Sequence, residues 1–182
     1  FDISEVTDEI REQYSNKYFP KEILYTANDQ EVVRGVNKIG QVKQEGFRVV
    51  QLRGLPRLKI KLNASVTMTG TNAKVLEIAE RVAFDMGRQL TVTSAFRTPE
   101  LNRRCGGASG SKHLQGLAMD IRTMEMTNDE KVEFVRLCAT YGALAFGFYN
   151  RFIHFDIHSK CNWGPIPNRY VPVLRQFKLN PY

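Results

Sequence analysis

The stretch that most constrains the fold is RFIHFDIH, at residues 151–158, because apolar and polar side chains alternate from Ile153 onward. Alternate side chains of a β-strand point to opposite faces of the sheet, so the pattern predicts a strand with one wholly apolar face. Successive side chains on one face lie about 6 to 7 Å apart. Two histidines flank a carboxylate on the second face, which favours a chemical site over a face that simply meets solvent. That second face carries Phe152, His154, Asp156 and His158.

A second stretch, SKHLQGLAMD at residues 111–120, places the remaining histidine of the chain seven positions before an aspartate. Gly116 lets the backbone turn or approach another segment closely. Ala118 is the small neighbour of Asp120 on the same face of the following strand, and it leaves room beside the carboxylate. His113 and Asp120 either converge on one point or belong to an ordinary turn that runs into a strand.

Together with one histidine of residues 151–158, these side chains make a set of His, Asp and His. Three nitrogen or oxygen ligands with a fourth position open for water are the composition of a catalytic zinc site. A structural zinc site normally uses four ligands rich in cysteine, and the three cysteines here are widely spaced without a CxxC pair. That spacing also argues against a disulfide framework. HxxGxAxD is not the helical HExxH motif, so spacing alone leaves the structural interpretation open.

Helix and strand signals surround these two stretches. Residues 71–87 place apolar side chains at helical spacing between a Thr-Asn cap and a closing glycine. Residues 90–97 indicate a buried strand that ends at a Thr-Pro pair. Residues 127–142 predict a second helix, because Thr127 and Glu130 have capping-box spacing.

The character of the sequence changes near residue 64, which predicts an N-terminal extension, residues 1–64, before a domain of residues 65–182. Residues 4–14 predict a helix, and a loop follows it. FRVVQLRGLPRLKIKLNASV, at residues 47–66, predicts two strands around a Gly-Leu-Pro turn, and the lysines of LKIKL form the solvated face of the second strand. Nothing in this segment looks catalytic, so it is a candidate docking or assembly segment.

The net charge of +7 and the pI of about 9.4 favour polyanionic surroundings, such as nucleic acid, a bacterial cell wall or acidic lipid. The chain has no basic stripe interleaved with aromatic residues and no nucleic-acid-binding motif, so we expect no nucleic-acid partner. It has no run of about 18 apolar residues that could span a bilayer. Its first residues also lack the basic-then-apolar order of a signal peptide.

SAFRTPELNRRCGGASGSKHLQGLAMDI, at residues 94–121, resembles the signature of the zinc D-alanyl-D-alanine carboxypeptidase family. That family also contains phage endolysins that cut L-Ala-D-Glu bonds and vancomycin-resistance dipeptidases. Its pattern is S-G-[YF]-R-[ST]-P-x-x-N, a Gly-Gly loop, then S-x-H-x-x-G-x-A-x-D-[IL]. AFGFYNRFIHFDIH, at residues 145–158, is similar to the F-[IV]-H-[VF]-D stretch of the branch with peptidoglycan endopeptidases. The resemblance implies an α+β fold of the hedgehog/DD-peptidase type, in which a small antiparallel sheet carries the zinc site and helices pack on it.

Carried over position by position, the resemblance implies zinc bound by His113, Asp120 and His154. The context F-x-H-x-D of His154 is the one that matches the family. Spacing leaves open the alternative in which His158 is the third ligand and His154 assists catalysis.

The resemblance also implies that Arg97 and Ser111 hold a carboxylate or carbonyl of the substrate, Arg97 through a bidentate, charge-assisted contact. Several members of the family place Glu or Asp three residues before the last zinc histidine, and here that position is Arg151. We therefore nominate Asp156 as the general base. His158 is then a partner of Asp156 or the proton donor to the leaving amine.

The function that the resemblance implies is zinc-dependent hydrolysis of amide bonds in peptidoglycan stem peptides, by a carboxypeptidase or an endopeptidase. The alternative is a zinc-binding relative that has lost catalysis and serves as a structural or binding module, which the missing acid at residue 151 favours. The expected place of action is the bacterial cell wall. A secreted, phage-released or virion-associated enzyme would reach it, and residues 1–64 could then dock the enzyme in a particle.

Overall fold

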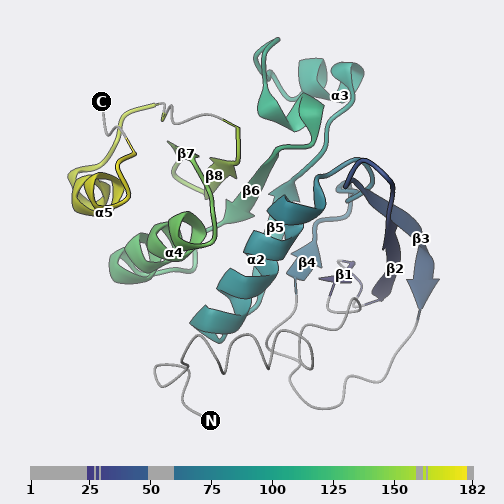
Figure 1. Cartoon of the computed structure of the whole chain (residues 1–182), viewed down its shortest axis with the longest axis horizontal. Coiled ribbons are helices and arrows are strands. Elements are labelled where there is room, and N and C mark those ends of the chain that lie inside the picture. Colours follow the sequence, from purple (N-terminus) through teal and green to yellow (C-terminus); the bar gives the residue numbers. More distant parts are fainter. Residues whose placement is uncertain are drawn as a thin grey trace.

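A computed structural model describes residues 24–26, 28, 30–48, 60–158, 162 and 164–179. Within them, eight strands form one sheet in the order β3-β2-β1-β4-β5-β6-β8-β7 (Figure 1). The strands are β1 (Leu24–Tyr25), β2 (Glu31–Val36), β3 (Val42–Arg48), β4 (Ile60–Leu62), β5 (Leu90–Ser94), β6 (Ala118–Arg122), β7 (Ala145–Phe148) and β8 (Phe152–Asp156). The helices are α2 (Ala73–Met86), α3 (Pro99–Arg104), α4 (Asn128–Thr140) and α5 (Val171–Gln176), with 3-10 turns η2 (Lys112–Gln115) and η3 (Asn168–Tyr170).

The sheet is mixed, so the expectation of an antiparallel sheet was wrong, while the α+β class is confirmed. β4 pairs in parallel with both β1 and β5, and the other pairs are antiparallel. The physical reason is the order β4, α2, β5: adjacent strands joined by a helical crossover run in the same direction. The strands on the candidate-site side, β5, β6, β8 and β7, do pair antiparallel.

Helices α2 and α4 lie side by side on one face of the sheet (Figure 1). Asn72 caps α2 by accepting the backbone N–H of Lys74, and Gly87, with a φ of 62°, ends it in the left-handed region that favours glycine. Thr127 and Glu130 form a reciprocal capping box at the start of α4. Both predicted helices are confirmed, each slightly shorter than its sequence signal.

The core lies between these two helices and the apolar faces of the strands. In β8, Ile153 and Phe155 are buried in this core, and Ile157 packs partly buried against it. The alternation of RFIHFDIH is therefore confirmed, because the core holds one face of the strand and leaves the other to His154 and Asp156. Other buried core residues include Leu76, Val82, Leu90, Val92, Met119, Ile121, Phe134 and Phe146.

On the N-terminal side, β2 and β3 form a hairpin whose turn is residues 37–40. We had expected a loop, and no strands, in most of this segment. The helix expected at residues 4–14 and the turn at Gly54-Leu55-Pro56 lie outside the described residues. In β4, Ile60 and Leu62 are buried and Lys61 is half-buried. The sheet continues across residue 64, and the boundary expected there stays a prediction. Among the residues that the structure describes, no helix has the length and apolar character needed to cross a bilayer.

Candidate metal centre

Strands β6, β8 and β7 place three rows of side chains across the face of the sheet opposite the core. Cα pairing aligns Asp120 with His154 and His154 with Gly147, and it aligns Asp156 with alanines on both sides. Glycine and alanine beside His154 and Asp156 leave space over these two side chains. We call Ala118, Asp156 and Ala145 the acid row, and Asp120, His154 and Gly147 the metal row. The rim row consists of Arg122 and Phe152 together with Tyr149, which lies in the turn between β7 and β8.

His113 reaches the metal row from η2, the short turn before β6. Ser111 caps η2 by accepting the backbone N–H of His113 at 3.3 Å. The segment after β5 then fixes the imidazole, because Nδ1 of His113 lies 2.7 Å from the carbonyl oxygen of Ala95. The ring is thus held by backbone on one side while its Nε2 atom points at β6 and β8.

Gly116 ends η2 and fixes where the turn lies. Its φ is 70°, and a Cβ atom there would lie 2.1 Å from the carbonyl oxygen of Gly70. The carbonyl of Gly116 also accepts the backbone N–H of Asn72 at 2.8 Å. Gly116 therefore both turns the backbone and approaches another segment closely, the two alternatives that the sequence left open.

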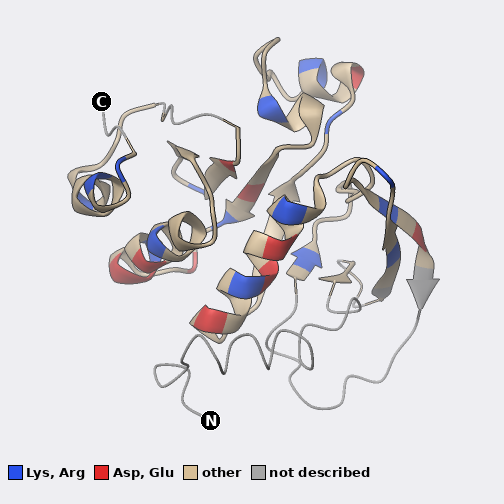
Figure 2. Ribbon diagram, in the orientation of Figure 1, with Lys and Arg blue, Asp and Glu red and all other residues tan. Residues whose placement is uncertain are grey.

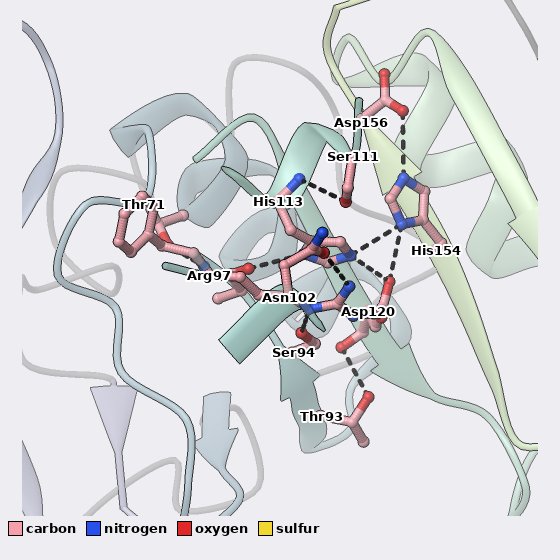
Figure 3. Close-up of polar contacts among 12 residues, drawn as sticks. Thr71, Thr93, Ser94, Arg97, Asn102, Ser111, His113, Asp120, His154 and Asp156 are labelled. Atoms are coloured by element: carbon pink, nitrogen blue, oxygen red, sulfur yellow. Dashed lines mark hydrogen bonds and ion pairs between the residues drawn. The ribbon is translucent and has the colours of Figure 1, made fainter. Parts of the chain in front are cut away.

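The side chains of His113, Asp120 and His154 converge, and all three are buried (Figure 3). The Oδ1 atom of Asp120 lies 3.1 Å from Nε2 of His113 and 2.9 Å from Nδ1 of His154. The two ring nitrogens lie 3.1 Å apart. Three potential ligand atoms thus form a nearly equilateral triangle.

The hydrogen bonds at the outer ring nitrogens test whether this triangle fits a metal ion. A carbonyl oxygen only accepts, so Nδ1 of His113 must donate to Ala95; Nε2 of His154 likewise faces Oδ2 of Asp156, at 3.2 Å. In the neutral tautomers that donate to Ala95 and Asp156, both inner nitrogens direct lone pairs toward the Asp120 oxygen, and a positive charge between them stabilises this arrangement. Tetrahedral zinc with ligand bonds of about 2.0 to 2.1 Å separates its ligand atoms by about 3.3 Å, close to this triangle. The donor set fits zinc.

The charges of the cluster agree with this interpretation. Burial alone would raise the pKa of Asp120, but the contacts with His113 and His154 outweigh it and hold this pKa well below its usual range. Burial would also lower the pKa of His154, but Asp120 and Asp156 outweigh it and raise this pKa. The two carboxylates thus favour a positive charge on the His154 side of the triangle, the charge that a metal ion would supply.

Arg97 lies beside the triangle and divides its guanidinium among three side chains. Its Nε donates to Oγ of Ser94 at 2.9 Å, and its Nη1 donates to Oδ1 of Asn102 at 3.3 Å. Its Nη2 lies 3.4 Å from Oδ2 of Asp120, the oxygen turned away from the histidines. Arg97 therefore orients Asp120 as well as facing the cavity.

Asn102 belongs to α3, an element that we did not predict. Thr98 caps this helix and Pro99 stands at its first turn, a signal that could have predicted it. Asn102 is buried and also donates to the carbonyl of Ala108 at 2.9 Å, which ties Arg97 to the glycine-rich loop. Asn102 is the asparagine that ends the family pattern S-G-[YF]-R-[ST]-P-x-x-N, but the resemblance implied no role for it.

A cavity of about 510 Å³ opens above the triangle. Asp156 lines it, while its Oδ1 accepts the backbone N–H of His158 at 3.1 Å. The His158 side chain is exposed and is not among the described residues that line the cavity. The structure therefore brings His154, rather than His158, to the other two candidate ligands. The cavity-lining residues used below are Arg97, Ser111, Lys112, Tyr149, Phe152 and Asp156.

Comparison with known families identifies the chain. The family model described as Peptidase M15 matches residues 49–156, more than half of the sequence. The chain belongs to the Peptidase M15 family. This M15 member is therefore a zinc metallopeptidase of the D-Ala-D-Ala carboxypeptidase family, with a His-Asp-His site suited to its cofactor. No curated protein sequence matches it at a significant level.

Proposed function

We propose that the protein hydrolyses amide bonds in the stem peptides of bacterial peptidoglycan, with zinc held by His113, Asp120 and His154. One observation carries this proposal: two imidazole nitrogens and a carboxylate oxygen, each within 3.1 Å of the others, lie under a cavity of about 510 Å³. Membership of the M15 family supports peptidoglycan as the substrate and the cell wall as the place of action. When bound by these residues, zinc would supply a water of lowered pKa and would polarise the substrate carbonyl.

Asp156 takes the proton from the attacking water and returns it to the leaving amine. Among the described residues that line the cavity, Asp120 and Asp156 are the carboxylates, and Asp120 belongs to the triangle. Asp156 also touches Nε2 of His154, so it holds the third ligand in its tautomer. His158 donates its backbone N–H to Asp156, and we propose it as the partner that holds this carboxylate in place.

Arg97 and Ser111, which both line the cavity, orient the substrate. The guanidinium of Arg97 lines the cavity with three of its nitrogens already held, so a substrate carboxylate or carbonyl meets a donor that is fixed in place. Figure 2 shows further Lys and Arg residues on α3 and η2, of which Lys112 lines the cavity. A basic rim suits an anionic wall polymer.

A second candidate is a zinc-binding module of the same fold that has lost catalysis. The observation behind it is Arg151, an exposed residue at the position where relatives carry an acid. In either case we propose a phage-released or virion-associated setting, or secretion, with residues 1–64 as the docking segment.

The test compares wild type with His113→Ala and, as a matched control, Met124→Ala, which removes an exposed side chain away from the cavity. Bound zinc is measured by elemental analysis, and muropeptides released from purified sacculi are identified by mass spectrometry. We expect one zinc per chain and muropeptide release in wild type and control, and neither in His113→Ala. Stoichiometric zinc and full release in His113→Ala would refute the site, whereas zinc without release in wild type supports the second candidate.

A further inference from the structure

The aromatic side chains at the mouth of the cavity have no place in the mechanism above. We propose that Tyr149 and Phe152, here called the aromatic platform, bind a sugar ring of the glycan strand while the attached stem peptide lies over the metal row. This inference rests on the proposed function and adds to it a second binding site for the same polymer.

The platform is a fixed structure. The rings of Tyr149 and Phe152 stack with centroids 4.5 Å apart and planes 16° from parallel. The backbone N–H of Tyr149 donates to the carbonyl of Phe152 at 3.1 Å, which closes the turn between β7 and β8. Tyr149 nevertheless exposes 48% of its surface, unlike most large apolar side chains of the described chain. Two preordered rings with an exposed face lose little entropy when a ligand binds.

Strand register places the platform next to the metal site. Phe152 precedes His154 by two positions on β8, so the two share a face and lie about 6 to 7 Å apart along the strand. Both platform residues line the cavity that holds His113, Asp120 and His154. Gly147, opposite His154, adds no side chain between the platform and the triangle. One ligand can therefore touch both places if its two parts are joined by two or three chain units.

The chemistry of the proposed substrate selects the sugar as the part that lies on the platform. Stem peptides contain alanine, glutamate and a diamino acid, none of which presents a flat apolar face. A pyranose ring does: its axial C–H bonds form such a face, and they are attracted to the negative face of an aromatic ring. The sugar is covalently attached to the first residue of the stem, so one ligand reaches both places when the cleaved bond lies within the first two or three residues of the stem.

The experiment compares two substrates, a disaccharide-bearing stem peptide and the same peptide without sugar, by the ratio of their kcat/KM values. Wild type is set beside Tyr149→Leu, which keeps apolar bulk but loses the ring, and Tyr149→Phe, which keeps the ring. We expect wild type to prefer the sugar-bearing peptide, and Tyr149→Leu to reduce that preference about tenfold. Tyr149→Phe retains the preference. Met124→Ala, equally exposed at 48% but outside the cavity, is the control for loss of surface.

An unchanged ratio in Tyr149→Leu, with both peptides cleaved, overturns the platform and leaves the proposed function intact. Failure of wild type to cleave either peptide overturns the proposed function instead. In that event the platform is tested by NMR titration of the zinc-loaded protein with the N-acetylglucosamine–N-acetylmuramic acid disaccharide. Shifts at Tyr149 that Tyr149→Leu abolishes support it, and their absence in wild type overturns it.

Discussion

In the half of the sheet made of β5, β6, β8 and β7, the strands and the loops that follow them supply the described residues that line the large cavity. In the other half, β3, β2, β1 and β4 supply none of them. The first half places small residues next to functional ones, as Gly147 stands next to His154. The second half ends in the hairpin of β2 and β3, where Val36 and Ile39 near the turn are exposed.

The two halves nevertheless meet at a short segment before α2. Thr71 in this segment is fully buried. Its carbonyl accepts the N–H of Val42 in β3, and its hydroxyl accepts the N–H of Phe96, the residue after Ala95. Gly116, which ends the turn of His113, packs against Gly70 in the same segment. Chemistry thus belongs to one half, while the position of His113 depends on both.

The largest effect should come from Asp156→Asn, which changes only the half of the sheet that lines the cavity. Loss of the proposed base should lower kcat by about 10² to 10⁴. The amide oxygen of Asn can still accept from His154, so bound zinc should stay at wild-type stoichiometry. Single-turnover rates and elemental analysis of the same samples check both expectations.

Arg151→Ala is the control for Asp156→Asn, because this exposed residue lies in the turn just before β8. It should keep kcat within about twofold of wild type. If Asp156→Asn instead loses zinc in parallel with activity, Asp156 serves to hold His154, and the base must be sought elsewhere.

The next effect tests the contact between the halves. Gly116→Ala should lower the free energy of unfolding by about 3 kcal/mol or more, because the new Cβ atom would lie 2.1 Å from a backbone oxygen that cannot move freely. Gly106→Ala is a matched control, since its φ is also 70° but nothing lies within 4 Å of its Cβ position. The control should lose only about 1 kcal/mol. If the two variants lose the same free energy of unfolding in urea, the positive φ rather than the contact with Gly70 causes the loss.

Sequence patterns predicted the parts of the fold that local chemistry determines. Helices α2 and α4 followed from apolar periodicity and their caps, and β8 followed from strict alternation. His113 and Asp120 followed from the stretch SKHLQGLAMD, whereas the family resemblance favoured His154 over His158, and the structure brings these three side chains together. Each of these signals lies within a few consecutive residues.

Most of the parts that escaped prediction have weak local signals or depend on contacts between distant segments. The hairpin of β2 and β3 is an edge whose strands mix polar and apolar residues, so period-two alternation is weak there. The second oxygen of Asp120 is held by Arg97, and Arg97 in turn by Asn102, a chain of partners that no spacing rule contains. The roles of Asp156 and His158 stay predictions for the same reason.

A smaller effect concerns the ion pair between Arg34 of β2 and Glu80 of α2, which fastens the hairpin to the helix. Burial raises the pKa of Glu80 to about 7 despite the neighbouring Arg34. The folded protein therefore binds more protons than the unfolded chain between about pH 4.5 and pH 7, and its stability falls as pH rises through this range. We expect Glu80→Gln to remove up to about 3 kcal/mol of this pH dependence. Glu77→Gln, on the exposed side of the same helix, should change the pH profile of urea unfolding much less, because the Glu77 charge is a minor contributor to the raised pKa of Glu80.

The smallest effect separates coupling between the halves from simple loss of stability. Thr71→Val keeps the shape of the side chain but removes the acceptor for the N–H of Phe96, and it should lower the free energy of unfolding by about 1 kcal/mol. Thr127→Ala removes the cap of α4 and should cost a similar amount far from the triangle. Only Thr71→Val should also weaken zinc binding, by a few fold, because Phe96 adjoins the Ala95 carbonyl that orients His113. Competition with a chelator measures this difference, and equal zinc affinities in the two variants would mean that the hairpin half supports the fold without positioning the metal ligand.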